Sequence, residues 1–346
     1  MLFRAVTVEA VSIVLPPRVV SSAEVEQSLA PLYDRLKLPF GRLEMMTGIR
    51  ERRFWQPGTR PSEAATSAGK KALAAAEVAP SEIGCLIHAS VCRDFLEPAT
   101  AAVVHERLGL SETCAIFDLS NACLGVLNAM AIAAEQIESG RIQAALIVAG
   151  ETAEGLYEAT VHTLLHDRTL DRNSLKRHFA SLTIGSAAAA VILRHASRSR
   201  TGHRLLGGAV RTDSRGHRLC QEDTAAASTL GPLMATDAEG LLQAGCALAQ
   251  RTWEAAKQTL GWDNESPRHI FTHQVGQAHR RATFALLGLD PARDFPTFPF
   301  LGNTGAAALP GAWALGMEQR RINAGDLVAL LGIGSGLSSL MLGLEW

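Results

Sequence analysis

The sequence has almost no excess of either charge and no long apolar run. Its 33 Lys and Arg residues are balanced by 34 Asp and Glu residues, giving a formal net charge of -1, so no overall field attracts nucleic acid or an anionic membrane. No stretch approaches the roughly 20 apolar residues that span a bilayer. Residues 1–16 include Arg4 and Glu9 and lack the apolar core of a signal peptide. We therefore expect a cytoplasmic protein without a nucleic-acid partner.

Paired cysteines are also missing. The six cysteines form no CxxC pair and no Cys/His spacing typical of a metal site. This argues against a structural zinc or a disulfide framework, and we expect no metal and no redox cofactor. By contrast, 47% of the residues are hydrophobic, which indicates a packed core. A length of 346 residues favours two domains or two fused halves.

Apolar runs alternate with helical periodicity along the chain. Short apolar runs at 83–89, 115–119 and 144–149 each precede a segment with helical spacing. The pattern returns at 269–273 and 326–331. Such alternation predicts an α/β protein with a mostly parallel sheet.

The two parts of the chain are similar to each other. IGCLIHASV resembles RHIFTHQVG, and AALIVAGETA resembles LVALLGIGSG. We interpret this similarity as an internal duplication, with an N-terminal half over residues 1–197 and a C-terminal half over residues 198–346. The more polar segments 157–180 and 201–237 are expected to be insertions that cap one face.

Cys123 lies where a predicted strand runs into a predicted helix. The segment IFDLSNACLGVLNAMAIAAEQIESG passes from an apolar strand through Ser120 and Asn121 into a helix that ends near Gly140. In the first helical turn, unpaired N–H groups and the helix dipole favour a thiolate and can bind a developing oxyanion. Taken alone, this position is more often that of a buried thiol that fills space beside Gly125.

Five short motifs occur in the order found in one enzyme superfamily. They are TGIRERRF at 47–54, SNACLG at 120–125, THQVG at 272–276, FLGNTGAAALP at 300–310 and LLGIGSGLSS at 330–339. Together they resemble the ketoacyl synthase III branch of the thiolase superfamily over nearly the whole chain. The resemblance implies duplicated βαβαβαββ halves in a five-layer αβαβα sandwich, normally assembled as a homodimer.

The resemblance also implies three catalytic side chains and an oxyanion hole. The Cys, His and Asn of the family match Cys123, His273 and Asn303. Cys123 holds the first acyl group as a thioester, while His273 Nε2 and the Asn303 amide stabilise the enolate of the second. Backbone N–H groups of Cys123 and of the turn at Gly334 and Ser335 are expected to form the oxyanion hole.

A condensation of two fatty acyl-CoAs needs a base, because neither substrate has a carboxylate to lose. The segment SVCRDFLEPATAAVVHERLGL at 90–110 resembles the OleA thiolases of bacterial long-chain olefin biosynthesis. In that family a glutamate of this loop reaches the active site across the dimer interface. The resemblance assigns this role to Glu97. The alternative is that Glu97 and Pro98 only flank the start of a helix.

These residues lead to a hypothesis for the reaction. We expect a non-decarboxylative Claisen condensation of two fatty acyl-CoAs to a 2-alkyl-3-keto acid, with coenzyme A thioesters as substrates and downstream olefin-pathway enzymes as candidate partners. Arg42 and Met46 stand where ketoacyl synthase III has a Trp and an Arg for the coenzyme adenine. Ala278 replaces an Arg associated with carrier-protein docking. These departures weaken the assignment of a malonyl carrier protein as substrate.

Three alternatives remain open on the sequence. A decarboxylating 3-oxoacyl synthase III would use a malonyl thioester, an acyl-thioester hydrolase would use Glu97 to activate water, and a silent subunit would only bind acyl chains. The basic cluster of Arg50, Arg52 and Arg53 is compatible with the phosphates of coenzyme A and equally with a structural role.

Overall fold

Nine strands form one mixed sheet at the centre of the protein. The computed structural model describes residues 1–228, 231–319 and 322–346. In it, the strand order is β11-β12-β13-β8-β1-β7-β6-β4-β5. The strands are β1 (Val6–Val14), β4 (Cys85–His88), β5 (Ala115–Asp118), β6 (Ala144–Glu151), β7 (Ala187–His195), β8 (Arg204–Thr212), β11 (His269–Thr272), β12 (Leu327–Gly334) and β13 (Ser338–Glu345).

The nine strands form two sets with the same plan. In the first, β1, β7 and β6 are antiparallel neighbours, and β4 and β5 continue in parallel. In the second, β8, β13 and β12 are antiparallel neighbours and β11 continues in parallel. A lone parallel bridge between Ile270 and Asp294 stands where a fifth strand would follow. The predicted duplication is confirmed, and the boundary at 197/198 stays a prediction.

The prediction of a mostly parallel sheet was wrong. Five of the eight strand pairings in the sheet are antiparallel, because the last strand of each half returns beside its predecessor and the two halves then meet through β1 and β8. Periodicity identifies strands but does not report their direction, which depends on the connections between them.

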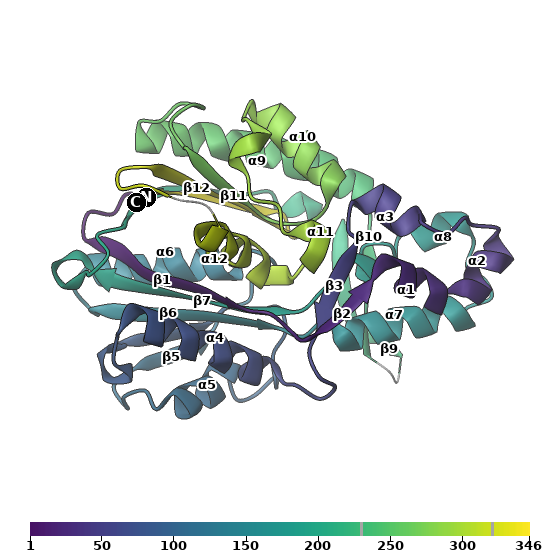
Figure 1. Cartoon of the computed structure of the whole chain (residues 1–346), viewed down its shortest axis with the longest axis horizontal. Coiled ribbons are helices and arrows are strands. Elements are labelled where there is room, and N and C mark those ends of the chain that lie inside the picture. Colours follow the sequence, from purple (N-terminus) through teal and green to yellow (C-terminus); the bar gives the residue numbers. More distant parts are fainter. Residues whose placement is uncertain (229–230, 320–321) are drawn as a thin grey trace.

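Two helices cover the outer face of each strand set and two lie between the sets (Figure 1). Through the molecule, these pairs are α4 (Pro61–Ala76) with α5 (Thr100–Leu108), α6 (Gly125–Glu138) with α12 (Ala308–Gln319), and α9 (Ala238–Leu260) with α10 (Gln277–Leu287). Leu127, Met130 and Trp313 of the middle pair are buried in one apolar cluster with side chains of both strand sets. The five-layer αβαβα sandwich is therefore confirmed.

β8 lies in the middle of the sheet, where the sequence predicted part of a capping insertion. Gly207 and Gly208 interrupt its apolar pattern and have φ values of 127° and 157°. A Cβ on Gly208 would lie 1.8 Å from the carbonyl oxygen of Met341, so the close approach of the two strands requires glycine. The prediction for 201–237 was wrong for this strand. Later residues of the segment form the hairpin of β9 (Cys220–Ser228) and β10 (Gly231–Thr236).

A small helical lobe extends from one end of the sandwich, at the right of Figure 1. It contains short helices from two separate parts of the chain and the hairpin of β2 (Arg18–Ser21) and β3 (Glu51–Phe54). Its helices are α1 (Ser22–Ser28), α2 (Ala30–Leu36), α3 (Arg42–Thr47), α7 (Glu154–His166) and α8 (Arg172–Lys176). Leu29, Leu32 and Leu164 belong to its separate apolar cluster. The remaining helix, α11 (Phe298–Leu301), leads into the Asn303 loop.

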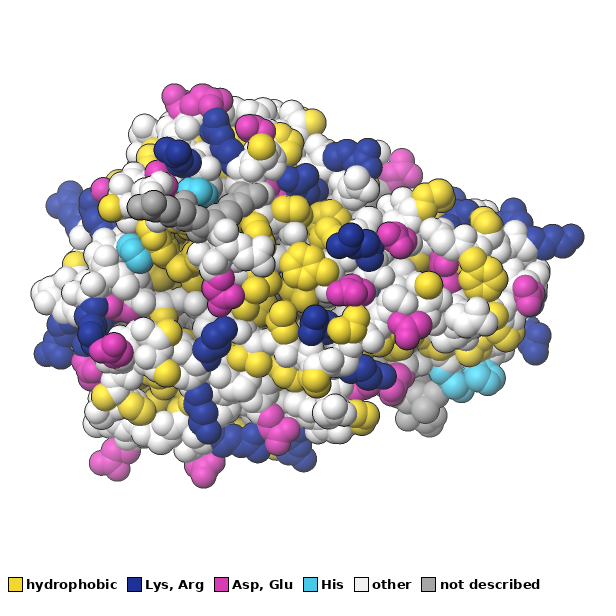
Figure 2. Space-filling view, viewed as in Figure 1, with side chains coloured by type: hydrophobic (Ala, Val, Ile, Leu, Met, Phe, Trp, Pro, Cys, Tyr) yellow, Lys and Arg dark blue, Asp and Glu magenta, His cyan; other side chains and the backbone are white. Residues whose placement is uncertain are grey.

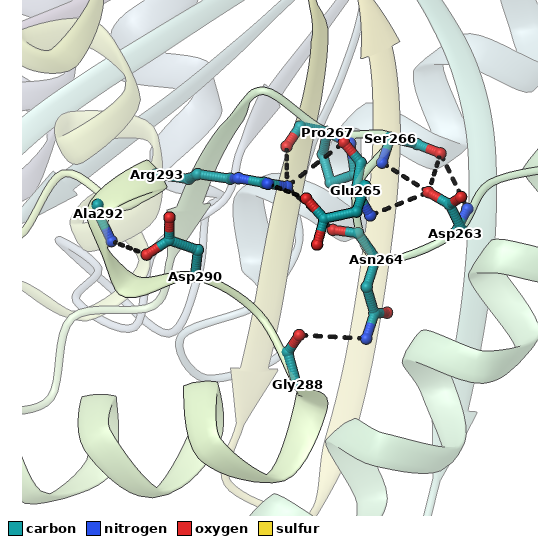
Figure 3. A network of polar contacts seen from close by, with 9 residues as sticks. All are labelled: Asp263, Asn264, Glu265, Ser266, Pro267, Gly288, Asp290, Ala292 and Arg293. Atoms are coloured by element: carbon teal, nitrogen blue, oxygen red, sulfur yellow. Dashed lines mark hydrogen bonds and ion pairs between the residues drawn. The ribbon is translucent and has the colours of Figure 1, made fainter.

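A polar network fixes the loop that leads into β11 (Figure 3). Arg293 donates to the carbonyl oxygen of Asn264 at 3.0 Å and pairs with Glu265. Asn264 Nδ2 donates to the carbonyl oxygen of Gly288 at 3.2 Å. The connection from α9 to β11 is thereby tied to the segment after α10, which fixes the strand that ends just before His273.

The surface carries mixed charges. On the face shown in Figure 2, Lys and Arg side chains alternate with Asp and Glu, and hydrophobic side chains gather near the middle, toward α11. This mixture is the distribution that the near-zero net charge predicts. Within the three described ranges, no helix is long and apolar enough to cross a membrane.

Candidate active site

Cys123 lies in a sharp turn between β5 and α6. The helix begins at Gly125, so Cys123 precedes it and the prediction that this residue belongs to the first helical turn was wrong. Ala122 has a left-handed φ of 47°, and the Leu124 N–H donates to the carbonyl oxygen of Asn121 at 3.0 Å. This turn ends the strand segment abruptly and leaves Cys123 at the entrance of a buried helix.

Glycine allows this turn to approach the end of β4. A Cβ on Gly125 would lie 2.6 Å from the carbonyl oxygen of Ala89, a distance that real Cβ atoms do not reach. Gly125 is therefore required by close packing, and its conformation brings the start of α6 against the strand that leads into the Glu97 loop.

The end of β12 packs on the other side of the same turn. A Cβ on Gly334 would lie 3.5 Å from the backbone nitrogen of Cys123 and 3.2 Å from Leu124 Cγ. Gly334 is thus the direct neighbour of the Cys123 N–H, and Ser335 follows it in a half-buried turn. The two backbone segments are therefore close, and the assignment of the oxyanion hole to Cys123, Gly334 and Ser335 stays a prediction.

The pKa of the Cys123 thiol lies well above its ordinary value. Burial, followed by the charges of Glu151 and Cys220, raises the pKa of the Cys123 thiol to about 12. The resting thiol is therefore protonated at neutral pH. Removal from water and a nearby carboxylate oppose the stabilisation of a thiolate by the helix entrance, and that stabilisation stays a prediction.

His273 directly follows β11 and is 6% exposed. Its N–H donates to the carbonyl oxygen of Leu331 at 3.2 Å, which extends the pairing with β12. Burial, and then the charge of His279, lowers the pKa of His273 to about 3. Among the described residues, its buried Nδ1 has no hydrogen-bond partner. A neutral imidazole can donate one N–H to a developing oxyanion and keep its proton.

Asn303 is held by three hydrogen bonds. Its backbone N–H donates to the Thr183 carbonyl oxygen at 3.0 Å, and its carbonyl oxygen accepts the Gly185 N–H at 2.9 Å. The side-chain oxygen Oδ1 accepts the Gly305 N–H at 3.1 Å. Because that donor identifies the oxygen, the amide nitrogen is the atom left to donate to a ligand. This orientation fits the predicted role as an enolate donor.

Glu97 is more exposed than Cys123, His273 and Asn303. It is exposed in the loop between β4 and α5, beside Leu96, which is 91% exposed. His273 is buried and Cys123 is half-buried. A single protomer therefore presents Glu97 to its surroundings and does not enclose it with the nucleophile.

Glu151 is a buried acid that the sequence analysis missed. It ends β6 and is 3% exposed. One carboxylate oxygen, Oε1, accepts N–H groups of Val91 and Ala306 at 3.0 Å each, and Oε2 accepts the Cys92 N–H at 3.1 Å. Burial raises the pKa of this carboxyl, and the three N–H donors act in the opposite direction.

The internal repeat contains a signal for Glu151. When AALIVAGETA is aligned with LVALLGIGSG, Glu151 takes the place of Gly334. An acid at a strand end that corresponds to the predicted oxyanion turn is a candidate site residue, because ligands bind outside the carboxyl ends of strands in α/β proteins.

The three arginines of the basic cluster differ in burial and in hydrogen bonding. Arg52 is fully buried, and its Nη2 donates to Ser22 Oγ at 3.1 Å. Burial lowers the pKa of Arg52 to about 10. Arg53 Nη1 donates to the carbonyl oxygen of Pro16 at 3.2 Å. The structural alternative therefore holds for Arg52 and Arg53, and Arg50 is the exposed member of the cluster.

Comparisons with known proteins show the family of this chain. The profile of 3-oxoacyl-[acyl-carrier-protein] synthase III matches residues 117–214, and that of its C-terminal part matches residues 258–346. Acyl-CoA:acyl-CoA alkyltransferases of Shewanella oneidensis and Xanthomonas campestris are 39% and 38% identical to this chain, with 100% of both chains covered. The chain belongs to the OleA family.

Solved OleA structures share the whole fold. Cerulenin-bound Xanthomonas campestris OleA has a TM-score of 0.95 and 38% identity, covering 100% of this chain and 98% of that chain. Variants of that OleA in which a cysteine, a glutamate or a histidine is replaced superpose equally well. A β-ketoacyl-[acyl-carrier-protein] synthase III of Rhodospirillum centenum is 32% identical over 84% of this chain and 86% of its own length. The resemblance drawn from the motifs is confirmed.

Proposed function

We propose that this OleA-family chain joins two fatty acyl-CoAs by a non-decarboxylative Claisen condensation to a 2-alkyl-3-keto acid. The observation that carries the proposal is the full-length similarity to acyl-CoA:acyl-CoA alkyltransferases in a chain that retains Cys123, His273 and Asn303. Coenzyme A thioesters are substrates in this reaction.

The first step transfers an acyl group to Cys123. Its sulfur attacks the thioester carbonyl of one acyl-CoA, a new carbon–sulfur bond forms, and the bond to the coenzyme A sulfur breaks. The proton lost by Cys123 leaves with coenzyme A as its thiol. Because the Cys123 pKa is about 12, loss of its proton has to accompany the attack, and His273 keeps its own Nε2 proton for the second step.

The second step forms the carbon nucleophile. Glu97 removes an α-proton from the second acyl-CoA, and the enolate oxygen accepts hydrogen bonds from His273 Nε2 and the Asn303 amide. The α-carbon attacks the acyl-Cys123 carbonyl, whose oxyanion is held by N–H groups of Cys123 and the Gly334 turn. Collapse expels the Cys123 sulfur, and the proton that Glu97 removed returns this sulfur to a thiol and Glu97 to a carboxylate. Water then cleaves the remaining coenzyme A thioester to give the keto acid.

A homodimer supplies Glu97 to this site. β5 is an outer strand of the sheet with Ala115 and Ile116 exposed, whereas β11 at the opposite edge is buried. An exposed apolar edge strand is normally paired or covered, and a second copy of β5 would continue the sheet. The exposed Leu96 and Glu97 belong to the loop between the two outermost strands on that side, so each subunit would present Glu97 to the other.

Incubation with one saturated acyl-CoA tests the reaction. We expect a β-keto acid by mass spectrometry without any malonyl substrate, and a strict malonyl requirement contradicts the proposal in favour of a decarboxylating synthase. Free fatty acid as the sole product indicates a hydrolase. Failure of Cys123 to accept an acyl label indicates a silent acyl-binding subunit.

A mixed dimer tests the exchange of Glu97 between subunits. Cys123→Ala and Glu97→Ala homodimers are each expected to be inactive in condensation, and the Glu97→Ala homodimer still acylates Cys123. Mixing the two variants creates dimers in which one site has both Cys123 and a Glu97 from the opposite subunit. Recovery of β-keto acid supports exchange, and absence of recovery in verified mixed dimers contradicts it.

The proposed reaction also implies a location for the enzyme and a class of partner enzymes. Acyl-CoAs are made by thioester-forming activation in the cytoplasm, and we propose that location for this enzyme. A 2-alkyl-3-keto acid loses carbon dioxide readily, so an enzyme that reduces or otherwise consumes it should follow. Downstream olefin-pathway enzymes are the proposed partners.

A further inference from the structure

The loop between β4 and α5 is firmly anchored below an exposed tip. Ser90 Oγ accepts the Gly150 N–H at 2.8 Å. The Asp94 carboxylate accepts the Ser62 N–H and hydroxyl at 2.9 Å and 2.6 Å. Between these anchors and α5 lie the exposed residues Leu96 and Glu97. A catalytic group at an exposed tip needs such a rigid base, because a displacement of about 1 Å can lower a rate about 100-fold.

Glu151 provides the central anchor of this loop. Its Oε2 accepts the Cys92 N–H at 3.1 Å, and its Oε1 accepts the Val91 N–H at 3.0 Å. Cys92 Sγ also accepts the Thr152 N–H at 3.4 Å. Two consecutive residues of the loop are thus fastened to the end of β6.

The same carboxylate holds the loop that carries Asn303. Its Oε1 also accepts the Ala306 N–H at 3.0 Å. A Cβ on Gly305 would lie 3.0 Å from Glu151 Cδ, and the Gly305 N–H fixes Asn303 Oδ1. One buried side chain therefore joins the backbone of two loops that are far apart in sequence and that both contribute to the proposed enolate step.

We propose that Glu151 is a positioning residue that locks the loop presenting Glu97 to the loop carrying Asn303. The inference rests on the proposed function, in which Glu97 forms the enolate and Asn303 stabilises it. In a homodimer, the lock of one subunit would set its own Asn303 and also the Glu97 that it presents to the other site. The Glu151 carboxylate accepts three backbone N–H groups, so it acts through these loops, and its charge also acts on the Cys123 pKa.

Glu151→Gln removes the acceptor for the Cys92 N–H. The amide oxygen can keep the place of Oε1 and its two contacts to Val91 and Ala306. The amide nitrogen then faces the Cys92 N–H, where two donors oppose each other. The reverse orientation would lose two contacts and is less favourable. The substitution therefore loosens the Glu97 loop and leaves the Asn303 loop in place.

We expect Glu151→Gln to separate the two half-reactions. Acylation of Cys123 should be retained or rise, because the substitution removes a charge that raises the Cys123 pKa, while β-keto acid formation should fall about 10- to 100-fold. Because condensation is slow in this variant, water should hydrolyse more of the acyl-Cys123 thioester to free fatty acid. The matched control is Glu9→Gln, which alters another buried carboxylate that accepts a loop N–H, that of Arg200 at 3.0 Å. This control should retain condensation.

Recovery of condensation in a mixed dimer distinguishes the positioning role from a general loss of stability in Glu151→Gln. Glu151→Gln mixed with Cys123→Ala yields dimers whose single Cys123 receives Glu97 from the subunit with an intact Glu151. Condensation should recover to half of the wild-type rate per dimer. Unrestored condensation in these dimers overturns the proposal, as does a Glu151→Gln homodimer that condenses normally or loses acylation and condensation together.

Two further variants keep the outcome clear. If Glu151→Gln does not fold, Glu151→Asp keeps the charge but shortens the side chain by one methylene, and the same separation of half-reactions is expected. Wild type that yields no β-keto acid, or Glu97→Ala that condenses normally, contradicts the proposed function itself. If Glu97→Ala loses condensation as expected and Glu151→Gln condenses at the wild-type rate, only the positioning role of Glu151 is contradicted.

Discussion

At the scale of single residues, the candidate site combines a protonated thiol with a neutral imidazole. Burial is the first cause of both shifts, raising the pKa of Cys123 to about 12 and lowering that of His273 to about 3. Both groups are therefore uncharged at neutral pH. Such a pair suits a pocket for fatty acyl chains, because an uncharged resting site costs little to keep away from water.

The reactivity of Cys123 should rise steadily with pH. The thiolate is the reactive form, and below a pKa of about 12 its fraction increases about tenfold for each pH unit. Alkylation by iodoacetamide, followed by mass spectrometry of the Cys123 peptide between pH 7 and about pH 10, should show no plateau. A plateau near pH 8 would mean that the thiol is not shifted upward.

Asn303→Asp should remove condensation and spare acylation. The new carboxylate can still accept the Gly305 N–H, but it places an acceptor where the enolate needs a donor. We expect condensation to fall about 100- to 1,000-fold, measured as β-keto acid formed from pre-acylated enzyme. Normal condensation by this variant would contradict the assignment of Asn303 as an enolate donor.

At the scale of elements, glycine determines how closely the Cys123 turn meets its neighbours. Gly125 faces the end of β4 and Gly334 faces the Cys123 backbone. These contacts bring α6, β4 and β12 together although they come from both halves of the chain. The fold thus assembles the site at the junction of three element ends.

Gly125→Ala should destabilise this junction. The added Cβ would lie 2.6 Å from the Ala89 carbonyl oxygen, and relief requires a backbone shift costing about 1–3 kcal/mol. Urea unfolding measures the change. Gly155→Ala in α7 is the matched control, since its Cβ meets nothing within 4 Å, and it should be neutral or stabilising by up to about 1 kcal/mol. Equal effects of the two substitutions would contradict the packing argument.

At the scale of the whole molecule, the two edges of the sheet differ. β11 is buried, while β5 exposes Ala115 and Ile116. The Glu97 loop lies on the side of β5. The proposed homodimer therefore accounts for two features at once, the uncovered strand and the exposure of Glu97.

Ile116→Lys should prevent dimer formation. A lysine on an edge strand opposes pairing with a second strand, so sedimentation should show a monomer. That monomer should acylate Cys123 but lose condensation by at least about 10-fold, because no second subunit supplies Glu97. Val19→Lys, on a hairpin of the helical lobe, is the control and should stay dimeric. A dimeric Ile116→Lys would contradict the proposed interface.

Much of the fold followed from the sequence because its signals are local. Short apolar runs identified strands, the internal similarity identified the duplicated halves, and ordered motifs identified the family and predicted Cys123, His273 and Asn303 as its site residues. β8 was missed because Gly207 and Gly208 break its pattern. Strand direction was misjudged because the connections, and not the residues of a strand, determine it.

The sequence by itself determined the family and the duplicated fold, and it predicted which residue types carry the chemistry. Only the tertiary structure decided their state. The pKa of Cys123 depends on burial and on Glu151, and Glu151 in turn binds N–H groups 60 and 155 residues away along the chain. Burial of Cys123 and contacts between residues this far apart in sequence exist only after folding. No local sequence pattern therefore encodes them.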